Sequence, residues 1–385
     1  MIYMSILSRL KLTKESLYFI SRNIFNISFR DISKVELVQK AYKGNPFVFM
    51  VVDKIASLTS RLPYVFVNSS NDIIEDSDEE NLWKQPQKGL YGSEFRKEIL
   101  TDLEVTGEAF VLGHKSVGFG EKYQEFEVLP SRSVFIKYTN NSKTEVSHYE
   151  LTQGNKTERI YNVEDVLHIK FQNITEDGKS GLSPLQAAYS VVSASTSIFQ
   201  SEDSIFKNRG VNEILTNDSD MPILSKEREG LQENFQNQTA GTDKFGQIMI
   251  TNAKLRNLKL GMSPSDLKLL ESSINKLRVI SSVYGLDSSL FNDPENKTYS
   301  NRAEAQKAAY NDVYIPLAEN EIIKTFNKWW LQDNWKSQLR LSIDKKNIEV
   351  LREVNSDLSA KIINEINAGI ITQEEGKELL YGNNN

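Results

Sequence analysis

Residues 266–310 read DLKLLESSINKLRVISSVYGLDSSLFNDPENKTYSNRAEAQKAAY. Apolar side chains recur at three- and four-residue steps from Leu267 to Tyr284, which predicts one amphipathic helix. Turn-forming residues dominate the stretch from Asp287 to Asn301 and predict a mobile polar loop with few core residues. The segment therefore predicts a long helix that runs into an irregular loop.

A second long helix is predicted after this loop. We expect it to begin at Ser300 or Asn301, with Glu304 completing a capping box. It is expected to run to Trp330 and to kink at Pro316, because proline removes an amide and crowds the preceding turn. Two long helices around a polar loop favour a protein that assembles and holds something over an enzyme with a pocket.

Composition limits the classes of protein to consider. The chain has 385 residues, of which 39% are hydrophobic and 25% charged, so two to three soluble domains are expected. It has no cysteine, which excludes disulfides, zinc–thiolate sites, iron–sulfur clusters and cysteine nucleophiles. Met1–Lys14 is too short for a signal sequence and no segment reads as a membrane span, so we expect an intracellular chain without a membrane partner.

Charge is unevenly distributed along the chain. The net charge of −6 argues against nucleic acid binding by bulk positive charge. An acidic run from Asp72 to Glu80 is expected to be a solvated loop. A basic patch follows later, formed by Lys244, Lys254, Arg256 and Lys259. This patch is as well explained by an acidic partner or DNA as by a solvated strand edge.

The predicted fold class is α+β. Up to about residue 225, helices after Asn45-Pro46 and Ser183-Pro184 enclose a series of short strands between residues 107 and 171. A helix through Leu231, a strand pair within Phe245–Leu260 and the long helix described above follow. The remainder is predicted to be helical, apart from a strand near residue 340 and a terminal helical hairpin capped by Thr372.

Candidate catalytic motifs are weak. Gly178-Lys179-Ser180 imitates half of a phosphate-binding loop, but Asn173 stands where the full pattern needs glycine. The three histidines have no metal-ligand spacing, and His168 is better explained as a core residue than as a general base. We therefore predict no catalytic residue, no metal and no cofactor.

The order of several short motifs resembles the portal protein family, the head-to-tail connectors of tailed double-stranded DNA phages. The matching stretches are Asn45-Pro46, residues 107–112 (GEAFVL), 166–169 (VLHI), 178–185 (GKSGLSPL), 206–210 (FKNRG), 262–266 (MSPSD), 299–301 (YSN), 314–316 (YIP) and 368–375 (AGIITQEE). Each motif is short, and it is their order over nearly the whole chain that carries the resemblance.

The resemblance implies a ring, usually dodecameric, with DNA passing through its centre. It implies a wing at residues 1–224, two stem helices at 225–286 with a clip at about 242–262, a tunnel loop at 287–300, and a kinked helix with a crown at 301–385. The stem helices would be the helix through Leu231 and the helix Leu267–Tyr284. Further partners implied are the terminase large subunit, the capsid and scaffold proteins and a head–tail adaptor, in the virion and, during assembly, in the host cytoplasm.

The site residues are assigned by position on this plan. The tunnel loop contributes Asn292, Asp293, Glu295, Asn296, Lys297 and Tyr299; the clip contributes Lys244, Lys254, Arg256 and Lys259; the stem contributes Lys268, Lys276 and Arg278. Because two acids stand beside Lys297, a near-neutral or repulsive lining that lets DNA slide is expected. A nucleotide-binding enzyme using Gly178-Lys179-Ser180 and another virion protein, such as an adaptor or capsid subunit, remain the alternatives.

Overall fold

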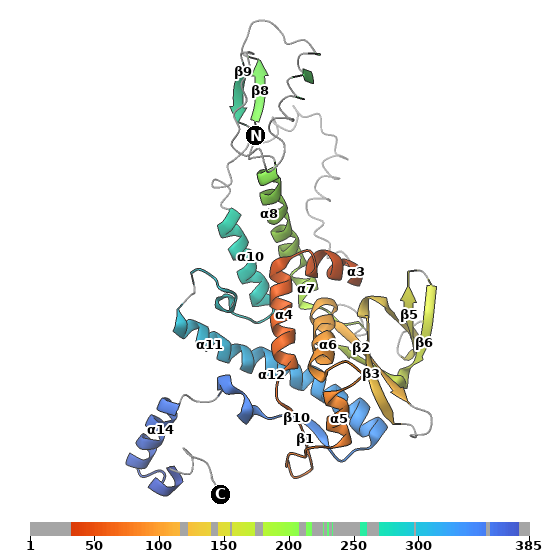
Figure 1. The fold of residues 1–385 in the computed structure, drawn as a ribbon, viewed down its shortest axis with the longest axis vertical. Helices are drawn as coiled ribbons and strands as arrows, with labels where there is room; N and C mark the ends of the chain where they lie inside the picture. The colour runs from red at the N-terminus through yellow and green to blue at the C-terminus, as the bar shows by residue number, and fades with distance from the viewer. Residues whose placement is uncertain are drawn as a thin grey trace, which may run out of the picture.

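The structure is a computed structural model (Figure 1). It describes residues 32–115, 122–139, 145–154, 156–173, 180–207, 213–217, 226, 229–230, 233, 255–259, 269–295, 298–351 and 355–376. At residues 204–207, 213–217, 255–259, 269–270, 299–300 and 355–360 only the backbone is described. In the part of the chain that the structure describes, no helix combines the length and apolarity that a membrane crossing requires.

Helix α4 (Pro46–Ser60) begins at the predicted cap. The Asn45 side chain accepts hydrogen bonds from the amides of Phe47 at 3.1 Å and Val48 at 3.3 Å, and proline at the first helical position fits this start. The Asn45 amide group also donates to Thr196 Oγ1 at 3.0 Å in helix α8. One buried residue therefore begins one helix and ties it to another.

Two antiparallel sheets lie beside helix α6 (Gly92–Thr106; Figure 1). One has the order β3-β2-β7 and the other β4-β5-β6. Their bounds are β2 Glu108–Lys115, β3 Tyr123–Leu129, β4 Val134–Tyr138, β5 Val146–Gln153, β6 Lys156–Asn162 and β7 Val166–Lys170. The predicted strands of this region are confirmed, with ends that differ by a few residues.

An aromatic cluster joins the sheet, the helices and the C-terminal part of the chain. Trp83 comes from α5, Phe95 from α6 and Phe126 from β3, and they meet Phe326 and Trp330 of the long C-terminal helix. Phe126 and Trp330 lie edge to face with ring centroids 5.1 Å apart, the preferred geometry for aromatic pairs. All five side chains are buried, so this cluster is the centre of the core.

The buried carboxylate of Glu108 begins strand β2. His168 Nε2 lies 2.6 Å from Glu108 Oε2, Lys34 pairs with the other oxygen, and the His168 ring stacks on Phe110. Burial alone would raise the pKa of Glu108, but the His168 hydrogen bond and the Lys34 charge lower it overall. The interpretation of His168 as a satisfied core residue is confirmed.

The acidic run was wrongly predicted to be entirely a loop. Its last residues form the first turn of helix α5 (Asp78–Lys84), which Ser77 caps by accepting from the amide of Glu80 at 3.1 Å. Carboxylates are favourable at a helix N-terminus, because they face the positive end of the helix dipole. Glu79 also accepts a hydrogen bond from Ser337 at 2.6 Å.

Helices α8 (Tyr189–Lys207) and α10 (Leu269–Val283) lie side by side and carry a two-stranded sheet at their far end (Figure 1). Strand β9 (Leu255–Lys259) pairs antiparallel with β8 (Glu213–Asn217), a pairing that was not predicted. The rest of the predicted strand pair, residues 245–254, lies outside the described residues. Helix α8 packs along α10, which also contacts α4 and α7, whereas Leu231 lies outside the described residues.

The long helix after the loop alternates between α-helical and wider π-helical turns. Its segments are α11 Tyr299–Ala309, a π-helix Tyr310–Tyr314, α12 Ile315–Leu317, a π-helix Ala318–Ile323, α13 Lys324–Phe326 and a π-helix Asn327–Trp335. The Ile315 amide bonds to the carbonyl of Tyr310, five residues back, just before Pro316. At Pro316, where a kink was predicted, the helix therefore accommodates the proline by a wider, π-helical turn just before it. Buried or half-buried side chains stand at every fourth position, namely Tyr310, Tyr314, Ala318, Ile322, Phe326 and Trp330.

The C-terminal part returns to the body and then leaves it. Strand β10 (Arg340–Ile343) pairs antiparallel with β1 (Tyr64–Val67). Helix α14 (Asn355–Asn367) follows apart from the body (Figure 1). Thr372 and Glu375 then form the predicted capping box, with the Thr372 amide 2.7 Å from Glu375 Oε2 and the Glu375 amide 3.3 Å from Thr372 Oγ1.

Candidate functional site

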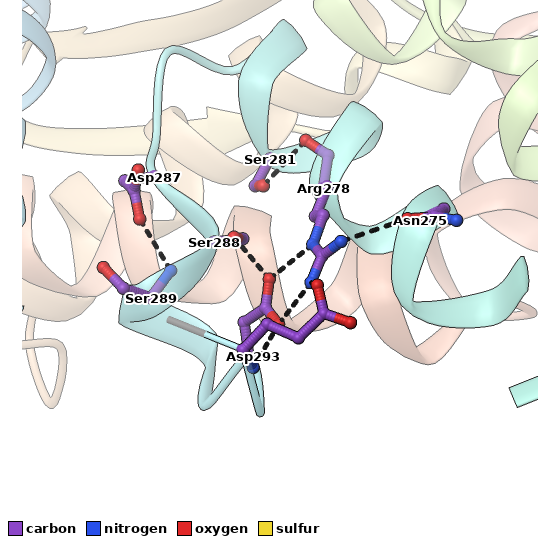
Figure 2. A network of polar contacts seen from close by, with 8 residues as sticks. Asn275, Arg278, Ser281, Asp287, Ser288, Ser289 and Asp293 are labelled. Atoms are coloured by element: carbon purple, nitrogen blue, oxygen red, sulfur yellow. Dashed lines mark hydrogen bonds and ion pairs between the residues drawn. The ribbon is translucent and has the colours of Figure 1, made fainter. Parts of the chain in front are cut away.

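Arg278 of helix α10 clamps the loop that follows this helix (Figure 2). Its Nε lies 2.6 Å from Asp293 Oδ2 and its Nη2 lies 2.8 Å from Asp293 Oδ1, a bidentate ion pair. Nη2 also lies 2.7 Å from Glu295 Oε2, and Nη1 lies 3.2 Å from Asn275 Oδ1. One guanidinium thus joins two loop carboxylates to the helix.

Asp293 is the buried centre of this clamp. Its side chain has no exposed surface, and it accepts two more hydrogen bonds, from the Ser288 hydroxyl at 2.7 Å and the Glu295 amide at 3.2 Å. The pKa of Asp293 lies well below its usual range, mainly because Arg278 donates hydrogen bonds to the carboxylate. Asp293 is therefore ionised and fully occupied by the protein.

The base of the loop is packed into the core, which corrects the prediction of a polar mobile segment. A 3₁₀ turn at Ser288–Phe291 begins at Asp287, whose side chain accepts from the Ser289 amide at 2.7 Å. Leu290 and Phe291 are both buried. Asn292 then adopts a left-handed conformation with φ of 59°, which asparagine tolerates better than most residues, and turns the chain toward Asp293.

Two further cations lie near the packed loop. The Lys54 ammonium of α4 lies 5.4 Å from the centre of the Phe291 ring, within the range of a cation–π contact. Burial, and next the charge of Arg302 in α11, lower the pKa of Lys54. Lys54 and Arg302 have no ion pair with a carboxylate among the described residues.

The cap of helix α11 lies two residues before Ser300 and three before Asn301. Thr298 is the cap, and its hydroxyl accepts a hydrogen bond from the Asn301 amide at 3.3 Å. The predicted cap at Ser300 or Asn301 is therefore wrong, because threonine supplies the same capping oxygen earlier in the sequence.

The structure brings together only some of the predicted site residues. Arg278 of the predicted stem contacts Asp293 and Glu295 of the predicted tunnel loop, while Asn292 is exposed beside them. Lys276 is half-buried in α10, Tyr299 is the first residue of α11, and Arg256 and Lys259 lie in strand β9. Asn296, Lys297, Lys244, Lys254 and Lys268 lie outside the described residues.

The residues that directly follow the Gly178-Lys179-Ser180 motif have packing and capping roles. Gly178 and Lys179 lie outside the described residues, but Gly181 packs directly on the backbone of Gly107, where a side chain would overlap the Gly107 carbonyl. Ser183, two residues on, caps helix α7 (Pro184–Ala187) by accepting from the Leu185 amide at 2.9 Å. Gly181 and Ser183 thus serve a close backbone approach and a helix start.

The clamp itself is the feature that sequence reasoning missed. Arg278 was assigned to the stem and Asp293 to the tunnel loop, without a contact between them. A local signal for this contact does exist. Asp293 precedes a proline turn and lies fifteen residues after Arg278, so the chain can bring the two together if it reverses direction once after the helix ends. Among the described residues, no group of three or more His, Asp or Glu side chains is placed so that it could hold a metal ion.

Replacing Asp293 with alanine is expected to release the loop from α10. The guanidinium would lose its buried partner, and the Ser288 hydroxyl and Glu295 amide would lose their acceptor. We expect a lower midpoint of thermal unfolding and about tenfold faster exchange of the Glu295 amide by hydrogen–deuterium exchange. Asp312→Ala removes the same group at an exposed position and serves as the control. Identical exchange in both variants would contradict the clamp.

Comparison with known proteins gives a family match over most of the chain. The model of a family described as "Phage portal protein" matches residues 46–380. Uncharacterized proteins of Rickettsia bellii (strain RML369-C) and Rickettsia felis (strain ATCC VR-1525 / URRWXCal2) are each 24% identical, over 357 and 359 residues. Each alignment covers 91% of this chain and 90% of the relative.

Solved structures share the fold. A chain from the neck of an empty gene transfer agent (GTA) particle, computed with C6 symmetry, has a TM-score of 0.68 at 23% identity, over 90% of this chain and 93% of that chain. A chain from the neck of the native particle, computed with C12 symmetry, has 0.65 at 23%, over 91% and 93%. An HK97 family phage portal protein from Corynebacterium diphtheriae has 0.57 at 10%, over 82% and 98%.

Proposed function

Because this chain belongs to the phage portal protein family, we propose that it assembles into a closed ring through which double-stranded DNA enters and leaves a phage-like particle. The family match over residues 46–380 is the observation that carries this proposal, since it spans the sheets, both long helices and the loop between them. The role is structural: the ring is a conduit and a docking platform, not an enzyme.

Each part of the proposed ring subunit is assigned to elements of the fold. On this proposal the wing ends before α8 rather than at residue 224, α8 and α10 act as the stem helices, and the sheet of β8 and β9 belongs to the clip. The loop at 287–300 is the tunnel loop, and the C-terminal helices form the crown. Support for α8 as a stem helix comes from its packing along α10 and from the clip strands beyond both helices (Figure 1).

A ring of twelve copies is proposed, in line with the C12 symmetry used for the similar neck chain. In such a ring each subunit repeats the same interface, so apolar helix faces left exposed on one copy become covered by the next. Val279 and Val283 of α10 are 45% and 40% exposed in the single chain, and they are candidates for this contact.

The ring has protein partners at both ends on this proposal. The basic clip residues, Arg256 and Lys259 among them, meet the terminase large subunit during packaging and a head–tail adaptor afterwards. Complementary charge at such a surface speeds docking and fixes orientation more than it adds affinity. The wing and crown contact capsid and scaffold proteins, and the assembled ring resides at the portal vertex of the virion after assembly in the host cytoplasm.

Imaging tests the proposal directly. Negative-stain micrographs of the purified protein, with a solution mass measurement, are expected to show closed rings with a central hole and a mass near twelve times 43.9 kDa. Ring symmetry together with an axial channel separates a portal from an adaptor or capsid subunit. A 43.9 kDa monomer at every concentration, with and without duplex DNA, would contradict the proposed assembly.

A further inference from the structure

The two carboxylates on Arg278 differ in their exposure to solvent. The Asp293 side chain is fully buried, whereas that of Glu295 is 75% exposed and that of Arg278 is 30% exposed. Arg278 therefore has an inner, protected partner and an outer partner that faces water. Both bonds are short, 2.6 Å from Nε to Asp293 and 2.7 Å from Nη2 to Glu295.

The outer bond is the weak one. An exposed ion pair contributes little to stability, because water and salt screen it. The inner pair is bidentate, shielded and supported by Ser288, so it persists when the outer partner is exchanged. An anion arriving from solution can therefore take the place of Glu295 without opening the clamp.

A phosphodiester is the anion that fits this place. A guanidinium binds phosphate and carboxylate oxygens with the same planar donor geometry, so the Nη2 edge now used by Glu295 matches a DNA phosphate equally well. Asp293 already balances the charge of Arg278. Glu295 thus adds a net negative charge on the solvent-facing side of the clamp.

We propose that Glu295 occupies the phosphate-binding edge of Arg278 and so prevents the tunnel loop from gripping the DNA that passes it. This inference rests on the proposed portal function and names the residue that keeps the passage non-adhesive. Each phosphate bound by a fixed cation strengthens binding and its dependence on salt. Repeated around a ring, one such contact in each subunit would hold the DNA in place.

Truncation of Glu295 tests the idea without disturbing the fold, because its exposed side chain fills no part of the core. We compare assembled rings of the wild type, Glu295→Ala and Glu304→Ala. Glu304 is exposed on α11 and has no ion pair among the described residues, so its loss changes the total charge equally. Binding of a short fluorescent DNA duplex is measured by anisotropy at several salt concentrations.

Only the Glu295→Ala ring is expected to bind more tightly, by about tenfold at low salt, with a steeper salt dependence. Glu304→Ala is expected to bind like the wild type. Equal binding by the two variant rings would overturn the role of Glu295 while leaving the ring and channel intact. Absence of rings in the wild type would overturn the portal proposal and this inference together.

Discussion

Gly181→Ala is expected to lower the free energy of unfolding by about 3 kcal/mol, the upper end of the usual cost of overpacking. The added methyl group would overlap the carbonyl oxygen of Gly107, which is backbone and cannot rotate away. That same carbonyl accepts a hydrogen bond from the Phe171 amide at 2.9 Å, so moving it disturbs the end of β7. Urea unfolding at one protein concentration measures the effect.

Gly181 lies directly before helices α7 and α8. Ser183 donates from its hydroxyl to the Glu104 carbonyl at 2.8 Å, which fixes the start of α7 against the end of α6. Gly230→Ala is the matched control, since no atom of the described residues lies within 4 Å of the place its methyl group would take. Equal stability of the Gly181 and Gly230 variants would show that the backbone contact is not tight.

Glu104→Gln is expected to remove most of the pH dependence of stability between about pH 4.5 and pH 8. Glu104 is 4% exposed, and burial, followed by the charge of Glu321, raises its pKa from 4.5 to about 8. In that window the folded chain keeps a proton that the unfolded chain has lost, so stability falls as pH rises. The stability contributed by the protonated Glu104 is therefore fully present below about pH 4.5 and is lost above about pH 8.

The glutamine variant carries a neutral group of the same shape at every pH. We expect it to match the wild type at pH 4 and to be more stable by several kcal/mol at pH 8.5, where the wild type must bury a charge. Unfolding free energies at pH 4, 6 and 8.5 measure this. Glu158→Gln, on the exposed strand β6, is expected to follow the wild-type curve. A Glu104→Gln curve parallel to the wild type would contradict the prediction.

Local signals in the sequence predicted most of the elements. Asn45, Ser183 and Thr372 cap the helices or turns that they were expected to cap, because a capping side chain acts on amides within three residues. The strands around β2 were likewise predictable from alternation, since one face of each lies on the core.

Contacts between distant segments could not be predicted in this way. Strand β9 pairs with β8, although about forty residues separate them and neither carries a signal that identifies the other. Arg278 is one of several cations near the loop, and the sequence does not indicate which of them contacts Asp293. In the structure, the chain folds back between α10 and the 3₁₀ turn, and this places Asp293 against Arg278. The fold class and family were therefore accessible from sequence, while the clamp and the pairing of β8 with β9 required coordinates.

The π-helical turns of the long helix determine how its buried side chains line up along the core. In a regular α-helix, a side chain repeated every fourth residue drifts around the axis, because one turn takes about 3.6 residues. The wider turns contain more residues, so side chains four apart, such as Tyr314, Ala318 and Ile322, can stay in line along the core. Inserting or deleting a single residue ahead of Trp330 would rotate everything beyond it away from that line, so the spacing of this helix is as constrained as its composition.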